Sequence, residues 1–197
     1  YGPPAKYDIE IRIHGQDIME NSVDSAHFAA VHGHAMPDNA FRHDGSTLRV
    51  TQRTTVERFG TTLRARLEFH LVEPGFHYVD FPEMPGPPAH VFSSIVPVDE
   101  QRVRHRLTIR VKKTRLPFVS GVARRFLLWQ MMKTYREDMQ IWETKKYLAR
   151  PVLCDGDVGI MKLRKWYAQF YDRTAETLAS VTEAAPEPAQ RRTERAS

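Results

Sequence analysis

The chain has 197 residues, 41% of them apolar, and carries a net charge of +5 at neutral pH. This length fits one domain with a proper hydrophobic core. No apolar run approaches the roughly 20 residues of a membrane-spanning helix, which excludes such a span. The single cysteine, Cys154, excludes an internal disulfide and fits a reducing compartment, so we expect a cytoplasmic protein.

The positive charge is densest at residues 102–115, where basic and apolar residues alternate. This alternation is typical of a strand with one solvated face. Because no aromatic residues are interleaved there to stack on bases, nucleic-acid binding is not expected. An acidic reductase or a neighbouring subunit is the better partner for this charge.

Taken in chain order, the patterns predict an antiparallel sheet with helices at its ends. Residues 7–14 alternate as a strand, and a helix carrying two histidines follows. Further strands are predicted at about 46–58, 61–72, 76–81, 90–97 and 101–113. A long helix is predicted over 118–148 and a last one near 161–180. Residues 184–197 lack apolar periodicity and are expected to be a disordered tail, so one α+β domain would cover residues 1–183.

The most informative stretch reads Glu20-Asn21-x-x-Asp24-x-x-His27-x4-His32-Gly33. A close pair of histidines backed by a carboxylate indicates a transition-metal site, since imidazole is a common ligand. Five steps along a regular helix place the two rings about 140° apart. They could share one ion only if the helix bulges or ends near His32, which Gly33 would allow. The alternative is two unrelated surface histidines.

A third ligand is expected from the long helix. The neighbours of Asp138 at helical spacing are mostly apolar: Met131, Thr134, Tyr135, Ile141 and Trp142. A carboxylate on a buried face is costly unless its charge is compensated. A divalent ion shared with His27 and His32 would compensate it, and the alternative is a buried salt bridge to an arginine. Glu137 shares its side with Lys133 and is expected to be solvated.

The histidine pattern, followed far downstream by Glu137-Asp138-x-x-Ile141-Trp142, resembles the catalytic domain of Rieske-type non-haem iron oxygenases. The later residues 151–157 and 164–171 are similar to the branch of 3-ketosteroid 9α-hydroxylases and sterol 7-desaturases. The resemblance covers about residues 7–172. It implies a helix-grip fold of the START/Bet v 1 kind, in which an antiparallel sheet wraps a long helix and a pocket opens between them.

The resemblance also implies the roles of individual residues. His27, His32 and Asp138 would hold a mononuclear Fe(II) and leave positions open for O2. Asp24 would be the bridging aspartate that receives an electron from a Rieske cluster in the adjacent subunit, and Asn21 would lie close to the iron. Asp24 lies one helical turn before His27, so we also expect its carboxylate to support that ligating imidazole.

The implied activity is the hydroxylation or desaturation of a hydrophobic polycyclic substrate, a steroid by resemblance to that branch. Electrons would come from NAD(P)H through a reductase, and the assembly would be a homotrimer. Rieske clusters need Cys-x-His and Cys-x-x-His pairs, which this chain lacks, and it begins with Tyr1 rather than Met. We therefore expect a catalytic domain whose 2Fe–2S domain was cut away, or a natural protein without one.

A second function class remains open, namely a ligand-binding helix-grip module with a vestigial metal site. The pocket is expected to contain large apolar side chains next to the ligands: Phe28, Val31, Met131, Tyr135 and Trp142. No Lys or Arg lies at helical spacing from the ligands, so a small acidic substrate is not expected. The other histidines are expected to have ordinary hydrogen-bonded or surface roles: His14, His34, His43, His70, His77, His90 and His105.

Overall fold

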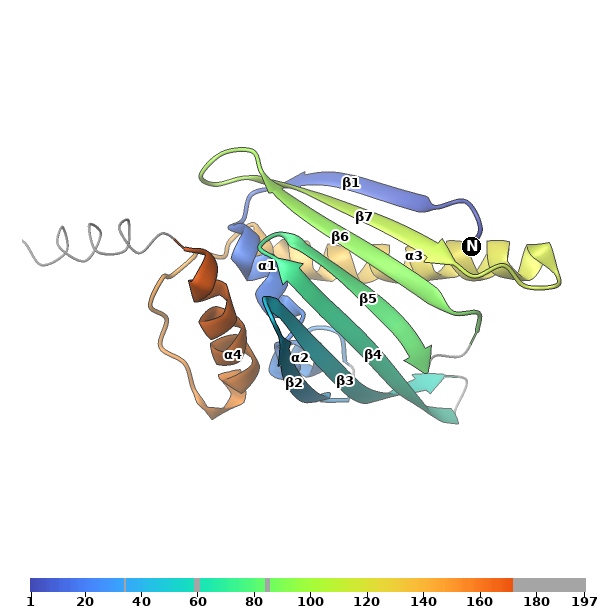
Figure 1. Cartoon of the computed structure of the whole chain (residues 1–197), viewed down its shortest axis with the longest axis horizontal. Coiled ribbons are helices and arrows are strands. Elements are labelled where there is room, and N and C mark those ends of the chain that lie inside the picture. The colour runs from blue at the N-terminus through green and yellow to red at the C-terminus, as the bar shows by residue number, and fades with distance from the viewer. Residues whose placement is uncertain (34, 59–60, 84–85, 172–197) are drawn as a thin grey trace, which may run out of the picture.

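The computed structural model describes residues 1–33, 35–58, 61–83 and 86–171. Seven strands form one antiparallel sheet in the order β1-β7-β6-β5-β4-β3-β2. The sheet curves around the long helix α3 (Pro117–Trp142), which passes behind it in Figure 1. The expected α+β class, with a sheet around a long helix, is confirmed. The expected tail at 184–197, and with it the domain boundary at 183, lies outside the described residues.

The second to seventh strands follow one another as an antiparallel meander. The first strand pairs with the free edge of the seventh. The strands are β1 (Ala5–Ile11), β2 (Asp38–Asp44), β3 (Thr47–Arg58), β4 (Thr61–Glu73), β5 (Phe76–Glu83), β6 (Ala89–Pro97) and β7 (Val103–Val111). The sequence analysis missed β2, an edge strand of mostly polar residues whose side chains are largely exposed. A strand that buries little has no alternation by which to recognise it.

The predicted alternation of β7 is confirmed, with Val103, Leu107 and Ile109 buried on the face toward α3. On the outer face, Arg102 forms an ion pair with Glu10 at 2.7 Å and Arg106 forms one with Asp8 at 2.8 Å. Both acidic residues belong to β1, the neighbouring strand. Part of the basic charge is therefore compensated within the sheet, which weakens the argument that it serves an acidic partner.

The helices differ from the prediction at their boundaries. The histidine motif spans two short helices, α1 (Gly15–Asn21) and α2 (Ser25–Ala30), rather than one. Helix α3 ends at Trp142, before the expected residue 148, and Lys145 beyond it pairs with buried Asp17 at 3.0 Å. That ion pair joins the segment after α3 to α1. None of the described helices is long and apolar enough to cross a membrane.

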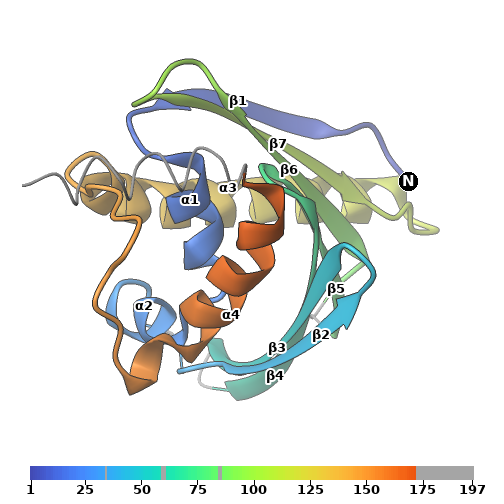
Figure 2. The ribbon, with the colours of Figure 1, turned by 60° about the vertical axis from the view of Figure 1, so that its left-hand side comes forward.

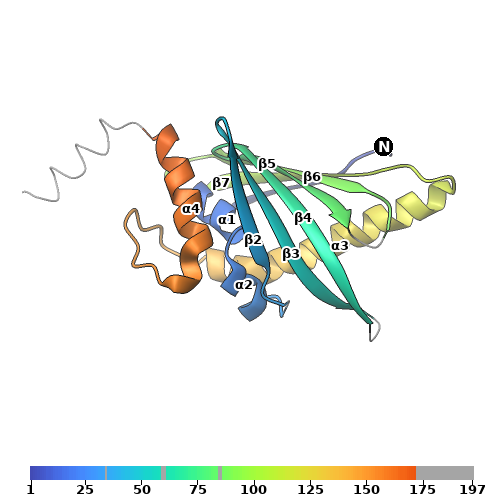
Figure 3. The same cartoon turned by 60° about the horizontal axis from the view of Figure 1, so that its bottom comes forward.

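The last helix, α4 (Val158–Tyr167), covers the open end of the curved sheet beside α1 (Figure 2). It buries Leu163 and Trp166, and the indole of Trp166 donates a hydrogen bond to the carbonyl of Ser46 at 2.6 Å. Figure 3 shows α1, α2 and α4 gathered at one end of α3. The segment with the histidine motif is thus held between α3 and α4.

Candidate metal centre

Three candidate ligand atoms from two distant segments meet near the C-terminal end of α3. Nε2 of His27 lies 2.9 Å from Oδ1 of Asp138, and Nε2 of His32 lies 3.2 Å from the same oxygen. The two nitrogen atoms are 3.1 Å apart. Three mutually perpendicular ligands at about 2.1 Å from an ion would lie about 3.0 Å from one another. The three atoms therefore have the spacing of one face of an octahedral metal ion.

The end of α2 resolves the awkward five-residue spacing. The helix stops at Ala30, and Gly33 adopts φ of 64°, a conformation that glycine takes without strain. His32 lies beyond the helix, so the direction of its side chain is not set by 100° steps along α2. Its ring is tilted by 85° to the ring of His27, with 4.8 Å between the centroids. Of the two routes left open by the sequence, the chain uses an early helix end.

The surroundings of Asp138 fit a bound cation. Oδ1 is buried and has no hydrogen-bond partner of suitable geometry among the described residues, although both histidine nitrogens are close. Burial tends to raise the pKa of Asp138, but the two imidazoles outweigh this and lower it. The ion pairs of the described residues join Asp138 to no arginine, which removes the alternative of a buried Asp–Arg pair. Three converging lone pairs are best satisfied by a shared cation.

Glu137 lies beside Lys133 as expected, with Nζ of Lys133 3.6 Å from its Oε1, but it also contacts the site. Its Oε2 accepts a hydrogen bond from Nδ1 of His32 at 2.9 Å, and its side chain is 33% exposed. Burial tends to lower the pKa of His32, yet its contacts with Asp138 and Glu137 raise it. A carboxylate on the second nitrogen fixes the tautomer and the orientation of a ligating imidazole. Helical spacing could not reveal this contact because His32 comes from another segment.

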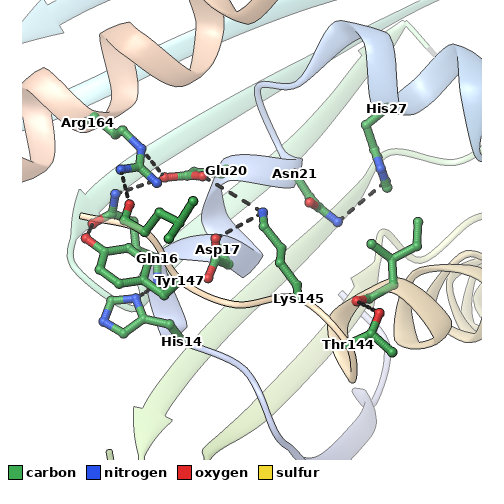
Figure 4. Close-up of polar contacts among 12 residues, drawn as sticks. His14, Gln16, Asp17, Glu20, Asn21, His27, Thr144, Lys145, Tyr147 and Arg164 are labelled. Atoms are coloured by element: carbon green, nitrogen blue, oxygen red, sulfur yellow. Dashed lines mark hydrogen bonds and ion pairs between the residues drawn. The ribbon is translucent and has the colours of Figure 1, made fainter. Parts of the chain in front are cut away.

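Asp24 and Asn21 flank His27 in different ways. Oδ1 of Asp24 accepts a hydrogen bond from the backbone N–H of His27 at 2.9 Å and so caps α2. This contact supports the backbone of His27, and support of its imidazole by the same carboxylate stays a prediction. Nδ2 of Asn21 lies 3.4 Å from Nε2 of His27, beside the nitrogen that faces the other ligands (Figure 4).

Helix α1 is anchored by a charged network that the sequence analysis did not find. Glu20, which is 3% exposed, pairs with Nε of Arg164 from α4 at 2.7 Å. Asp17, which is 1% exposed, pairs with Lys145 from the segment after α3 (Figure 4). Since Asn21 is the last residue of α1, these ion pairs hold it in place next to His27.

A cavity of about 150 Å³ lies between the ligands and the inner face of the sheet. Of the expected pocket residues, Phe28, Met131, Tyr135 and Trp142 line it, but Val31 does not. The sheet contributes lining residues that the analysis did not assign: Phe69, Val79, Val91 and Leu107.

The cavity wall also holds an uncharged polar cluster. His105 contacts Oγ of Ser93 through Nε2 at 2.7 Å and the hydroxyl of Tyr135 through Nδ1 at 2.7 Å. Burial lowers the pKa of His105 to about 3 and that of nearby His77 to about 4, so both rings are neutral. The inward orientation of His105 could have been predicted from the sequence, because this residue occupies an inward position of the alternating β7 pattern.

Comparison with known proteins decides the family. Residues 3–171 match the model of the 3-ketosteroid 9alpha-hydroxylase C-terminal domain. The chain belongs to this family. The oxygenase component of 3-ketosteroid-9-alpha-monooxygenase from Rhodococcus rhodochrous is 27% identical over 189 residues, which are 88% of this chain and 49% of that protein. Cholesterol 7-desaturase nvd from Xenopus laevis is 27% identical over 106 residues, which are 53% of this chain and 22% of that protein.

Solved structures agree on the fold. The NdmA protein of Pseudomonas putida CBB5 with caffeine superposes with a TM-score of 0.66 at 15% identity, over 88% of this chain and 53% of that one. A START superfamily protein from Mycobacterium smegmatis gives 0.56 at 13% identity, over 72% and 98% of the two chains. The helix-grip fold and the resemblance to Rieske-type oxygenase catalytic domains are confirmed. The chain spans about half the length of the Rhodococcus relative.

Proposed function

We propose that this domain belongs to a monooxygenase that oxidises a steroid-like substrate at an Fe(II) ion held by His27, His32 and Asp138. The triangle of ligand atoms, with sides of 2.9, 3.1 and 3.2 Å, carries the proposal. Two imidazoles and one carboxylate with open positions suit non-haem Fe(II). When bound, the iron would supply the O2 chemistry for oxidising a C–H bond.

The chain's own residues orient and shield that centre. Glu137 holds His32 through its second nitrogen, and Asn21 lies beside the metal-facing nitrogen of His27. Trp142, which is 2% exposed, lines one side of the cavity with apolar surface. These contacts support a site whose ligands are positioned before substrate arrives.

The cavity supports an apolar and uncharged substrate. None of its lining residues, among those the structure describes, is a lysine or an arginine. The polar cluster around His105 could accept or donate hydrogen bonds to a neutral oxygen of a steroid-like molecule. Ligand pockets usually hold about 300–1,000 Å³. Since the cavity is about 150 Å³, a steroid must displace half-buried side chains such as Phe28 and Met131.

Electrons must come from outside this chain. Its one cysteine cannot form the Cys–His pairs of a Rieske cluster, so we propose that a 2Fe–2S domain of the longer subunit supplies them. A reductase using NAD(P)H would reduce that cluster. We further propose that the full-length subunits form a homotrimer, because the family resemblance implies transfer to Asp24 from a neighbouring subunit. Light scattering on the full-length protein measures this assembly.

Metal analysis tests the site. Anaerobic reconstitution with Fe(II) should leave about one iron per chain, whereas His27→Ala, His32→Ala and Asp138→Ala should each lose it, because two ligands hold Fe(II) poorly. His43→Ala, at an exposed position on β2, is the matched control and should retain iron. Folded wild-type protein that stays metal-free would instead support the ligand-binding module.

A ligand titration tests the substrate class. The iron-loaded domain should bind a 3-ketosteroid and bind benzoate poorly, because the cavity wall is apolar and lacks a basic residue among the described positions. Selective binding of benzoate would contradict the steroid proposal and leave the iron site intact.

A further inference from the structure

The outer face of the sheet, turned away from α3, carries a second group of metal-binding side chains. Glu68 on β4 is the cross-strand partner of Asp80 on β5, and Asp80 is the partner of His90 on β6. His70 lies two residues along β4 from Glu68 and therefore on the same face. Phe69, between them, lines the cavity on the opposite face. The sheet thus separates this group, which we call the outer-face cluster, from the iron ligands.

The geometry of the cluster fits a small cation. One ligand atom each from Glu68, His70 and Asp80 lies within 4.8 Å of the other two. Nε2 of His70 is 3.4 Å from Oδ2 of Asp80. Two ligands of a tetrahedral Zn²⁺ at about 2.1 Å would lie about 3.4 Å apart.

His70 supplies an independent observation. The residue is only 8% exposed, and its Nε2 is buried without a hydrogen-bond partner among the described residues. The contact with Asp80 is too poorly aligned to satisfy it. The ring of Tyr78 stacks on that of His70 at 4.3 Å and 6°, which fixes the imidazole plane. A buried polar atom left unpaired costs about 1–3 kcal/mol, so a ligand for Nε2 would remove a real penalty.

The neighbours of the cluster hold the two carboxylates in position. Nδ1 of His90 hydrogen-bonds to Oδ1 of Asp80, which leaves Oδ2 toward His70. Nε of Arg66 donates to Oε1 of Glu68 at 3.1 Å, and the hydrogen bonds among the described residues leave the second oxygen of that carboxylate unused. Arg66 also pairs with Glu83, so its charge is shared among carboxylates. Enough negative charge remains at the cluster to balance a divalent ion.

We propose that Glu68, His70 and Asp80 bind a divalent transition-metal ion of the Zn²⁺ class at a site distinct from the iron centre. A mixed set of imidazole and carboxylate ligands suits Zn²⁺. The side chains of Glu68 and Asp80 are 29% and 28% exposed, so water can complete the coordination. The ion would tie β4 to β5, whose inner faces form the wall of the cavity, and His90 would act as a positioning residue for Asp80.

Calorimetric titration with Zn²⁺ tests the site in a chain that carries His27→Ala and His32→Ala, so that the iron ligands cannot contribute. We expect about one Zn²⁺ per chain and a higher Tm when it is bound, as for any ligand specific to the folded state. Adding His70→Ala or Asp80→Asn should abolish both effects. Adding His43→Ala, an exposed histidine on β2 of the same sheet, should leave them unchanged.

The proposal is overturned if the double variant binds no Zn²⁺, or if it binds equally after His70→Ala. Should the double variant fail to fold, the metal content of the wild type saturated with Fe(II) and Zn²⁺ replaces it, and His70→Ala should lower that content by about one ion per chain. An unchanged content would overturn the proposal as well. Because iron loading is measured separately, neither result bears on the iron site.

Discussion

At the scale of single residues, His32 depends on two carboxylates from one helix. Asp138 faces its Nε2 at 3.2 Å and Glu137 accepts from its Nδ1 at 2.9 Å. Adjacent side chains on a helix point about 100° apart. The two carboxylates can contact both nitrogens of one imidazole only because the ring of His32 lies across the face of α3 between them. This arrangement makes Glu137 a positioning residue for the metal ligand.

Glu137→Ala should weaken iron binding by about 10- to 100-fold, because the imidazole loses the group that orients it. Glu137→Gln should recover part of the affinity, since an amide oxygen still accepts a hydrogen bond from Nδ1. Competition with a chelator measures both values. Glu143→Ala, at the exposed end of α3, is the control. Equal affinities for Glu137→Ala and wild type would remove Glu137 from the site.

Two substitutions of Asp24 distinguish its role as a helix cap from its proposed role in electron transfer. Asp24→Ala removes the cap of α2 and should lower the free energy of unfolding by about 1 kcal/mol. Asp24→Asn keeps an oxygen for the His27 N–H, so stability and iron content should stay near wild type. If Asp24 receives electrons, Asp24→Asn in the full-length protein should lose turnover with reductase supplied. An Asp24→Asn enzyme of wild-type activity would contradict that role.

At the scale of elements, the approach of α4 to the histidine motif depends on Gly159. A Cβ built at Gly159 would lie 2.2 Å from the carbonyl oxygen of Val23, in the link between α1 and α2. Only a hydrogen fits there. Val23 itself is 1% exposed, so neither partner can move away freely. The packing of a distant helix therefore fixes the residue just before Asp24.

Gly159→Ala should destabilise the domain by about 1–3 kcal/mol through overpacking and should also weaken iron binding. Gly121→Ala in α3 is the matched control, since nothing lies within 4 Å of its Cβ. That substitution should instead stabilise by up to about 1 kcal/mol, as expected for a helix interior. Chemical denaturation measures both changes, and a stabilised Gly159→Ala would contradict the close approach.

Local sequence patterns were sufficient to predict some of the strands and helices but not others. The alternation of β7 and the helix formers of α3 were recognisable in the sequence because each buries one regular face. The edge strand β2 buries little and was missed. The end of α3 was placed six residues too late, and beyond that end Lys145 pairs with Asp17, which is far away in the chain. Local propensity does not include such a partner.

At the scale of the whole molecule, the buried histidines make folding sensitive to acid. The pKa of His77 is lowered to about 4 and that of His105 to about 3, against 6.5 for an exposed ring. Between these values the unfolded chain binds more protons than the folded one, so stability falls as pH drops below about 6.5. The loss should reach about 2 kcal/mol per histidine at about pH 5.

A variant isolates this effect. The stability difference between wild type and His77→Leu should shift by about 2 kcal/mol in favour of the variant between about pH 7 and pH 5, because leucine has no proton to bind. Denaturant titrations of the metal-free proteins at several pH values measure it, and the difference cancels the other titrating groups. A difference that does not depend on pH would contradict the buried, neutral state of His77.

The sequence by itself determined the α+β class and the trio His27, His32 and Asp138 as candidate ligands, and its resemblance to a known family implied the sheet around a long helix. Periodicity identifies a buried face, and a histidine pair with a carboxylate on such a face is readable wherever it occurs. Only the tertiary structure decided that Glu137 reaches His32, that Val31 misses the cavity and that the outer-face cluster gathers on one side of the sheet. Those contacts join residues of different segments, and their distances depend on how the sheet and helices pack, which spacing along the chain does not encode.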